Sequence, residues 1–424
     1  MTAQRETEKA QFVGHFKHTR FFCGLSCSYL KEKRLRKRTQ IIIGVFTLTT
    51  FVWITNYFIG SYARENATET LKQAEHLLIK GQPNQAIDKL KKLLKYDPEN
   101  SKALFLLGQS YYNQKEYTKS LDKFLTIPER SDLYGAALLN VAKSSIQTAK
   151  IEQAEDALEK YLIKFPNSSP ARTELQWLYF NQFRLREVES LLQAGLLQAE
   201  NPYPFLYHLL HLEFKPPIAQ ESIRLLKRIN DAQTGQASVI MALGYCYWKL
   251  GKTEQAKVLI NESLTIIPDR IESILVAADF YLELGELTKC EAILHQKYPQ
   301  QIQSSLEQDD RWHWILSRLQ FQKNNQTAAL EEIQKSLKLN PYQIKYLQYC
   351  GTIKQALGQQ KEAQQFFQQA KKLALSHREL DKIVSSGVLE QPTKADCLQV
   401  SQYCKDLGKV IQSREWKKIA TSLQ

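Results

Sequence analysis

The chain has 424 residues, of which 24% are charged and 43% hydrophobic, as in ordinary folded proteins. Glycine (16) and proline (13) are scarce, which favours helix and argues against an all-β sandwich or barrel. The formal net charge is +13, but residues 1–39 hold ten Lys or Arg against three acidic residues, so a general nucleic-acid-binding surface is not predicted.

Residues 40–60 are predicted to form one transmembrane helix, preceded by a basic cytoplasmic tail over 1–39. No charged residue occurs from Ile41 to Ile59, and about 20 helical residues span the hydrocarbon core of a bilayer. Six of the eight residues 31–38 are basic, so the positive-inside rule places the N-terminus in the cytoplasm and the rest of the chain across the membrane. A cleaved signal peptide, a soluble core helix and a nucleic-acid-binding arm are the alternatives.

From residue 67 onward the sequence repeats with a period of 34 residues. Small residues dominate the eighth and twentieth positions of each unit, and the twenty-fourth position is always large and apolar. Small residues at these places allow two antiparallel helices to approach closely. Proline ends four of the units at their thirty-second position. The nine units begin at Ala67, Ser101, Gly135, Ser169, Tyr203, Ala237, Ile271, Asp310 and Ile344.

A helix–turn–helix period of 34 residues with these columns resembles the tetratricopeptide repeat (TPR), most clearly in the unit from Ala237 to Arg270. The resemblance implies an all-α, right-handed superhelical α-solenoid of about nine to ten units after the transmembrane helix. Nine units cover 67–375, a linker is expected at 376–392, and a degenerate capping unit at 393–424. Pro216 and Pro217 interrupt the usual turn of one unit, so the helix geometry or superhelical twist is expected to shift there.

The resemblance also predicts where a partner would bind, because the first helix of each TPR pair lines a concave groove. Aromatic and arginine side chains at such positions are the ones that binding hot spots favour. The alternative for each residue is packing against a neighbouring helix. The predicted groove residues are Phe105, Gln109, Tyr112, Tyr207, His211, Tyr245, Trp248, Trp314, Arg318 and Phe321.

The sequence carries no motif that indicates catalysis. It contains no glycine-rich phosphate loop, nucleophile elbow or metal-binding spacing, so no enzyme activity, cofactor, metal or small-molecule substrate is predicted. Cys397 and Cys404 are expected to be small core residues, and His313 a partly buried structural histidine.

The predicted function is therefore a membrane-anchored scaffold or adaptor that binds a partner protein or peptide in its groove. The array is expected on the far side of the membrane, in a bacterium the periplasm. Two alternatives stay open: a regulatory or recruiting subunit of an envelope enzyme or export system, and a receptor whose array faces the cytosol.

Overall fold

The computed structural model describes residues 49–51, 53, 54 and 66–423. The predicted cytoplasmic tail and most of the predicted transmembrane helix at 40–60 lie outside these residues. Within the described ranges, no helix is both long and apolar enough to cross a membrane. The chain divides into two compact units, residues 1–98 and 99–424.

Among the described residues of the first unit, a helix over 66–79 and α2 (Pro83–Tyr96) form an antiparallel helix pair. Ala74 and Ala86, at the eighth and twentieth positions of the repeat, are fully buried, as is Leu90. Gly81 joins the two helices with a φ of 70°. This pair is the repeat unit that the sequence places at Ala67.

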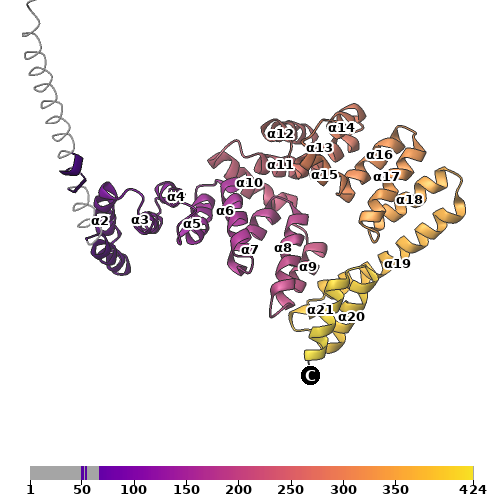
Figure 1. The fold of residues 1–424 in the computed structure, drawn as a ribbon. Coiled ribbons are helices and arrows are strands. Elements are labelled where there is room, and N and C mark those ends of the chain that lie inside the picture. Colours follow the sequence, from indigo (N-terminus) through magenta and orange to yellow (C-terminus); the bar gives the residue numbers. More distant parts are fainter. Residues whose placement is uncertain (1–48, 52, 55–65, 424) are drawn as a thin grey trace, which may run out of the picture. The chain divides into compact units, whose positions relative to one another are not determined.

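The second unit is built from helix pairs joined by short turns, and its described residues, 99–423, include no strand (Figure 1). Its helices are α3 (Ser101–Asn113), α4 (Tyr117–Leu125), α5 (Tyr134–Gln147), α6 (Ile151–Lys164), α7 (Ser169–Asn181), α8 (Leu185–Gln198), α9 (Tyr203–Phe214), α10 (Ala219–Ala232), α11 (Ala237–Lys249), α12 (Thr253–Ile266), α13 (Ile271–Glu283), α14 (Leu287–Leu294), α15 (Gln300–Glu307), α16 (Asp310–Gln322), α17 (Gln326–Leu339), α18 (Ile344–Ala356), α19 (Gln360–Ser385), α20 (Lys394–Asp406) and α21 (Val410–Ser422), with a 3₁₀ turn, η1 (Val388–Glu390), before α20.

The repeat columns have a direct packing cause. A Cβ atom added to Gly108 would lie 2.8 Å from the ring of Phe124, and one added to Gly351 would lie 2.6 Å from the ring of Phe367. The large residue at the twenty-fourth position therefore covers the small residue at the eighth position of its own unit. This contact fixes how closely the two helices of a pair approach.

The turn inside each pair requires a left-handed backbone at the fifteenth position of the unit. Glycine adopts this conformation without a steric cost, and other residues adopt it at some cost. The fifteenth residues with positive φ are Gly81, Lys115, Ala149, Phe183, Gly251, Gly285, Asn324 and Gly358.

The unit that begins at Tyr203 carries Pro217 at this position, and the proline ring holds φ near −65°. The usual turn cannot form, and the helix pair opens. Helix α9 packs against α8, α19 and α21, whereas α10 packs against α11. The change of geometry that the sequence predicts at Pro216 and Pro217 is therefore present.

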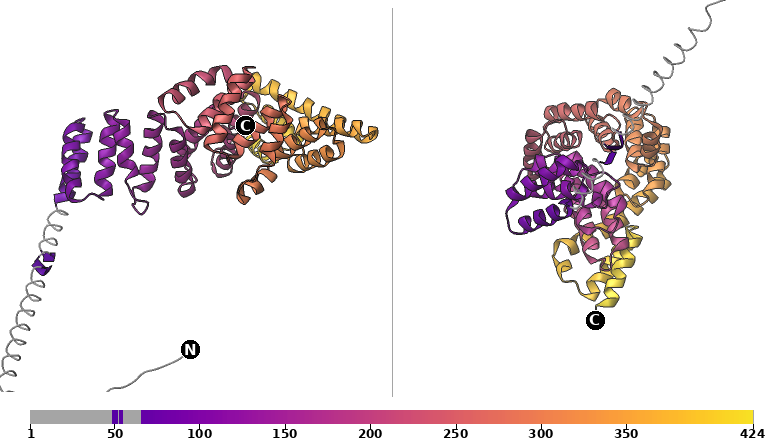
Figure 2. Two further views of the ribbon diagram at one scale, coloured as in Figure 1. Left: turned by 90° about the horizontal axis from the view of Figure 1, so that it is seen from above. Right: turned by 60° about the vertical axis from the view of Figure 1, so that its left-hand side comes forward.

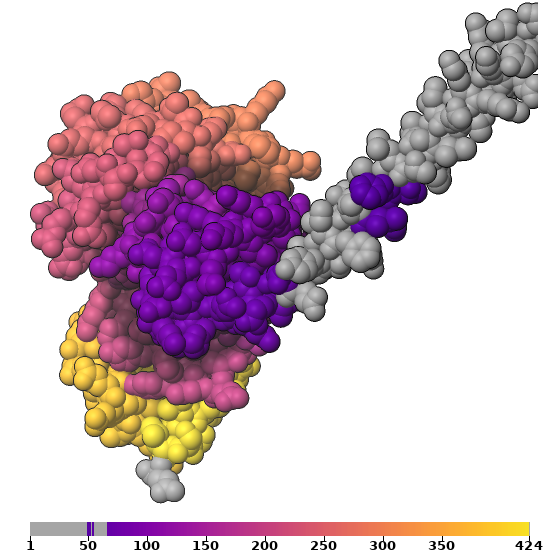
Figure 3. All heavy atoms as spheres, turned by 90° about the vertical axis from the view of Figure 1, so that its left-hand side faces the viewer, coloured from indigo at the N-terminus to yellow at the C-terminus, as the bar shows by residue number. Residues whose placement is uncertain are grey.

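Helix α9 contacts the C-terminal helices across a long distance in sequence (Figures 2 and 3). The Glu213 carboxylate pairs with Lys409 Nζ at 3.1 Å and with His377 Nε2 at 3.4 Å. The Phe214 ring lies 4.7 Å from the His377 ring between centroids, and the Tyr203 hydroxyl donates to the Leu389 carbonyl oxygen. We call this set of contacts the α9 closure.

Two segments differ from the sequence-based expectation. The predicted linker at 376–392 is helical as far as Ser385, because Leu373, Leu380 and Val384 are buried on one side of the continuous helix α19. Between α14 and Asp310, where the unit that begins at Ile271 is longer than 34 residues, the chain forms the additional short helix α15, which buries Leu306.

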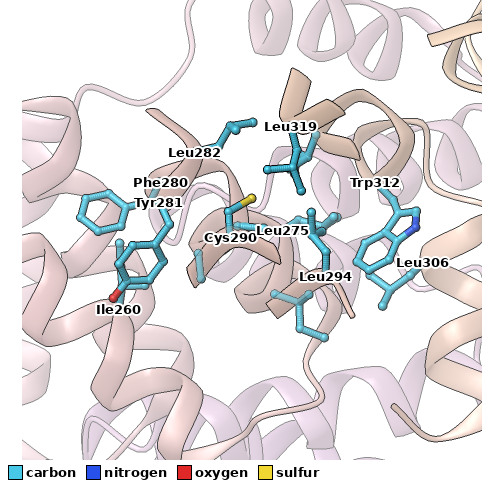
Figure 4. Close-up of a cluster of buried hydrophobic side chains, with 14 of the residues drawn as sticks. Ile260, Leu275, Phe280, Tyr281, Leu282, Cys290, Leu294, Leu306, Trp312 and Leu319 are labelled. Atoms are coloured by element: carbon cyan, nitrogen blue, oxygen red, sulfur yellow. The ribbon is translucent and has the colours of Figure 1, made fainter. Parts of the chain in front are cut away.

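A cluster of buried hydrophobic side chains in the second unit surrounds α13 and α14 (Figure 4). Phe280, Cys290, Leu306 and Leu319 are fully buried there, and Trp312 is nearly so. Burial of this apolar surface holds α11–α16 together and gives the first helices of these units a rigid base.

Candidate functional site

A cavity of about 720 Å³ lies between the first helices α11, α13, α16 and α18 and the turn that joins α7 to α8. We call it the central cavity. Because one wall is the concave side of the predicted groove and the other is a turn far away in sequence, folding encloses the site on two sides. The charged and aromatic side chains of its lining include Phe183, Arg184, Arg186, Tyr245, Trp248, Lys249, Arg270, Glu272, Asp279, Arg311, Trp314, Arg318, Lys345 and Tyr346.

Aromatic side chains form the floor of the central cavity near α11. Tyr245 lies 5.1 Å from the ring of Phe183 and 5.7 Å from that of Trp248, between centroids. Trp248 Nε1 donates to Glu283 at 3.1 Å, and Lys249 Nζ lies 3.5 Å from its ring centroid. Burial raises the pKa of Tyr245 to about 12, so its phenol stays protonated and can donate a hydrogen bond.

Ion pairs join the two walls. The Glu155 carboxylate lies 2.7 Å from Arg184 and 3.5 Å from Arg270, and Arg186 pairs with Asp309 and Asp310. These pairs connect the region of α6–α8 to the region of α12–α16. Glu155 lies between Arg184 and Arg270, and Asp309 between Arg186 and Arg311, so two carboxylates each link arginines from separate parts of the chain.

Arg311 lines the central cavity and binds two carboxylates. Its guanidinium lies 2.8 Å from Glu272 and 2.8 Å from Asp309. Burial alone would raise the pKa of Asp309, but the hydrogen bonds and charge of Arg311 outweigh burial and lower it. Arg311 and Asp309 therefore both stay charged.

Lys345 is the unusual cation of the central cavity. Its Nζ lies 5.4 Å from the ring centroids of both Trp314 and Tyr346, and no ion pair joins it to any residue in the described part of the chain. The pKa of Lys345 is lowered, chiefly because the side chain is partly buried by surrounding protein. Asp279 and Asp310 act to raise this pKa, and Arg186 and Arg318 act to lower it. The side chain is nevertheless exposed to solvent within the cavity.

Four of the ten predicted groove residues come together in the central cavity: Tyr245, Trp248, Trp314 and Arg318. Arg318 pairs with Asp279, and Trp314 lies 4.9 Å from the Tyr349 ring between centroids. Phe321 lies one turn further on and packs on Tyr349 at 5.7 Å, outside the cavity lining.

Two predicted residues, Tyr207 and His211, lie elsewhere on α9. Their rings stack at 4.0 Å between centroids, and burial lowers the pKa of His211. His211 lines a separate, mostly apolar hollow of about 440 Å³ together with Trp177 and Phe205.

The three predicted residues on α3 are half-buried and lie outside the central cavity. Phe105 packs edge-on against Phe124 at 5.5 Å, and Tyr112 against Tyr117 at 5.2 Å. For these two aromatic side chains, the packing alternative describes the observed contacts. Gln109 lies between them on the same helix.

The cavity also contains residues that sequence reasoning missed. Glu272 and Lys345 occupy the second position of their units, as Ser238 and Arg311 do. In the TPR geometry this position of the first helix faces the groove, so applying the same rule to the units at Ile271 and Ile344 would have predicted both residues. Phe183 and Arg186 carried no such signal. They reach the cavity only because the chain changes direction after α9.

The remaining candidate groups are structural. His313 is buried, with Nδ1 2.6 Å from Glu332 and Nε2 2.9 Å from the Glu307 carbonyl oxygen. Cys397 and Cys404 are fully buried free thiols. In the residues for which the structure gives positions, no group of three or more His, Cys, Asp or Glu could hold a metal ion.

Two protein-family models match the chain. Residues 237–270, which are the repeat unit from Ala237 to Arg270, match the tetratricopeptide repeat. Residues 79–161 match the family described as anaphase-promoting complex, cyclosome, subunit 3. These matches cover only part of the chain, and together with the repeating helix pairs they support an all-helical, solenoid-like fold of tetratricopeptide-repeat type.

Solved structures similar to this chain share little sequence with it. MamA from Desulfovibrio magneticus RS-1 is 19% identical, over 42% of this chain and 98% of its own, with a TM-score of 0.33. The Cut9–Hcn1 hetero-tetramer of APC/C is 11% identical, over 83% of this chain and 89% of the matched chain, with a TM-score of 0.40. YrrB, described as a TPR protein with an unusual peptide-binding site, is 15% identical, over 48% of this chain and 88% of its own, with a TM-score of 0.27. No curated protein matches the chain.

Proposed function

We propose that this chain is a membrane-anchored scaffold that holds a segment of a partner protein in the central cavity. The observation that carries the proposal is the cavity itself. It offers about 720 Å³ with the half-buried rings of Tyr245, Trp248 and Trp314 along one wall. This volume lies in the range of sites that enclose a ligand of several side chains.

The composition of the cavity favours a peptide over a metabolite. Aromatic residues and arginine are the side chains that dominate binding energy at protein interfaces. Two rigid walls, fixed by the pairs of Arg184 and Arg186, let a partner bind without first ordering the site, which reduces the entropic cost of association.

The anchor belongs to the proposal and is supported by the sequence. The uncharged run over 41–59 follows the basic residues 31–38 directly, and this order is typical of a helix that leaves its N-terminus in the cytoplasm. The array would then lie across the membrane, in a bacterium in the periplasm.

Topology is tested with two fusions after Gln424. Alkaline phosphatase is active only outside the cytoplasm, and a suitable fluorescent protein matures only inside. We expect an active phosphatase and no fluorescence. The opposite pattern would overturn the proposed topology and make the array a cytosolic receptor.

Binding in the cavity is tested by site-specific photo-crosslinking in cells. A photoreactive amino acid is placed at Trp248, in the cavity, or at Val258, which is 66% exposed on α12 and is not part of the cavity lining. We expect one discrete crosslinked partner from position 248, lost when Trp314 is changed to Ala. Equal products from both positions, or products unaffected by Trp314→Ala, would contradict the proposal.

A further inference from the structure

The charges of the central cavity are unevenly matched. Seven basic and three acidic side chains are found among its described lining residues. Its five arginines are Arg184, Arg186, Arg270, Arg311 and Arg318. Each of them pairs with a carboxylate that lines the cavity or lies just behind the lining. The two lysines, Lys249 and Lys345, have none within the described residues, so the excess positive charge resides on them.

The surroundings of Lys345 suit a carboxylate from outside. The ammonium group lies beside the Trp314 and Tyr346 rings, each 5.4 Å away at its centroid. These rings exclude water from one side, and a charged hydrogen bond formed there is stronger than one in bulk solvent. Arg186 and Arg318 lie nearby but are paired with Asp310 and Asp279, so the charge left for an added carboxylate is that of Lys345 itself.

Lys345 is not a lysine that merely lacks a partner at the surface. A surface lysine is fully hydrated and gains little from pairing. Lys345 lies on the wall of the central cavity, where surrounding protein lowers its pKa although part of the side chain is exposed to solvent. An anion beside it would supply the carboxylate partner that this ammonium group lacks among the described residues, which a neutral ligand would not do.

We propose that Lys345 binds an Asp or Glu side chain of the partner, and that the segment held in the central cavity is an acidic peptide with an apolar or aromatic residue next to that acid. The apolar neighbour would lie on Trp314 and on Val276, which also lines the cavity. This inference rests on the proposed function, since it names the class of partner for the same site.

The inference is tested by selecting peptides on the purified full-length chain from a random-sequence display library. A peptide is counted only if its binding is lost with Trp314→Ala, which ties it to the cavity. We expect these peptides to be enriched in Asp and Glu next to an apolar residue. A selected synthetic peptide should bind Lys345→Gln about tenfold more weakly, as expected for one lost charge-assisted contact.

A double-mutant cycle shows whether the contact is direct. Replacing the acid of the peptide by its amide should weaken binding to the original chain about tenfold and should cause little further loss with Lys345→Gln. Lys338→Gln is the matched control, because Lys338 is exposed on α17 and is not part of the cavity lining. It should leave the affinity unchanged.

Two results separate this inference from the function on which it rests. Peptides that depend on Trp314 but show no preference for acids, or that are insensitive to Lys345→Gln, would overturn the inference and leave the peptide-binding cavity standing. If no selected peptide depends on Trp314, both are overturned. Thermal unfolding of each variant shows that the fold is retained.

Discussion

Ile260 fills the space in which a side chain on Gly244 would begin. A Cβ atom at Gly244 would lie 2.9 Å from Ile260 Cγ1, 3.2 Å from the Ile260 backbone nitrogen and 3.4 Å from the Ala256 carbonyl oxygen. Two of these three atoms belong to the backbone of α12, so a rotamer change alone cannot make room. The spacing of α11 and α12 is set by the absence of a side chain.

We expect Gly244→Val to destabilise the chain by about 3 kcal/mol, because the added methyl groups must force the two helices apart. Urea denaturation followed by circular dichroism measures the loss. Ala395→Val, at an exposed position of α20, is the control and should have a small effect. Equal stabilities of the two variants would show that the contact does not set the helix spacing.

The buried carboxylate of Glu155 is predicted to matter far more than an exposed one. Glu155→Ala leaves Arg184 and Arg270 without this partner in a poorly hydrated site, and we expect a loss of about 3 kcal/mol. Glu99→Ala removes the exposed pair with Arg130 and should change the stability very little. Denaturant midpoints compare the two variants, and similar midpoints would contradict the prediction.

The pair formed by His313 and Glu332 is predicted to make stability depend on pH. Burial alone would lower the pKa of His313, but the hydrogen bonds to Glu332 and to the Glu307 carbonyl outweigh it and raise the pKa above 6.5. Burial alone would raise the pKa of Glu332, but its pairing with His313 and Lys335 lowers it below 4.5. The stabilisation from His313 is therefore complete below pH 6.5 and is lost as the pH rises through the raised value. That from Glu332 is complete above pH 4.5 and is lost as the pH falls.

His313→Gln should consequently cost most near about pH 5.5 and less near about pH 8.5, because the original histidine loses its charge as the pH rises through its raised pKa. Thermal unfolding of both chains at the two pH values gives the difference. His208→Gln, at an exposed position on α9, should shift stability equally at both. A cost of His313→Gln that does not vary with pH would exclude a charged pair.

The five cysteines of the array are predicted to be unreactive while the chain is folded. Burial raises the pKa of Cys246, Cys290 and Cys404 to about 12, and the thiolate is the reactive form. With Cys23 and Cys27 changed to Ser, a thiol reagent should label nothing in native buffer and five groups in denaturant. Rapid labelling of any thiol in native buffer would contradict this burial.

Local contacts explain what the sequence predicted well. The small residue at Gly244 and the large one at Ile260 are 16 positions apart, and their contact lies within one helix pair, so a column of residues reveals it. The same is true of the turn, where Pro217 marks the break because its φ cannot become positive. Four groove residues followed from the same periodicity.

Contacts between distant units explain what the sequence could not predict. Arg186 meets Asp310 across 124 positions, and no periodic pattern relates the two. The α7–α8 turn enters the cavity only because of where the chain turns after α9. The helix over 376–385 was missed for a similar reason, since its burial depends on contacts with α9 and α20.

The α9 closure also determines the order in which parts of this chain can become stable. In an array with contacts only between neighbours, each repeat can fold as soon as it is complete, and the ends can unravel one repeat at a time. Here Tyr203 contacts Leu389, 186 positions later, so the middle of the chain keeps an uncovered surface until its last helices have been synthesised. Losing the C-terminal helices would expose α9 again, and contacts of such long range slow folding. The second unit is therefore expected to gain and lose its structure as a whole, with its C-terminus as the final piece.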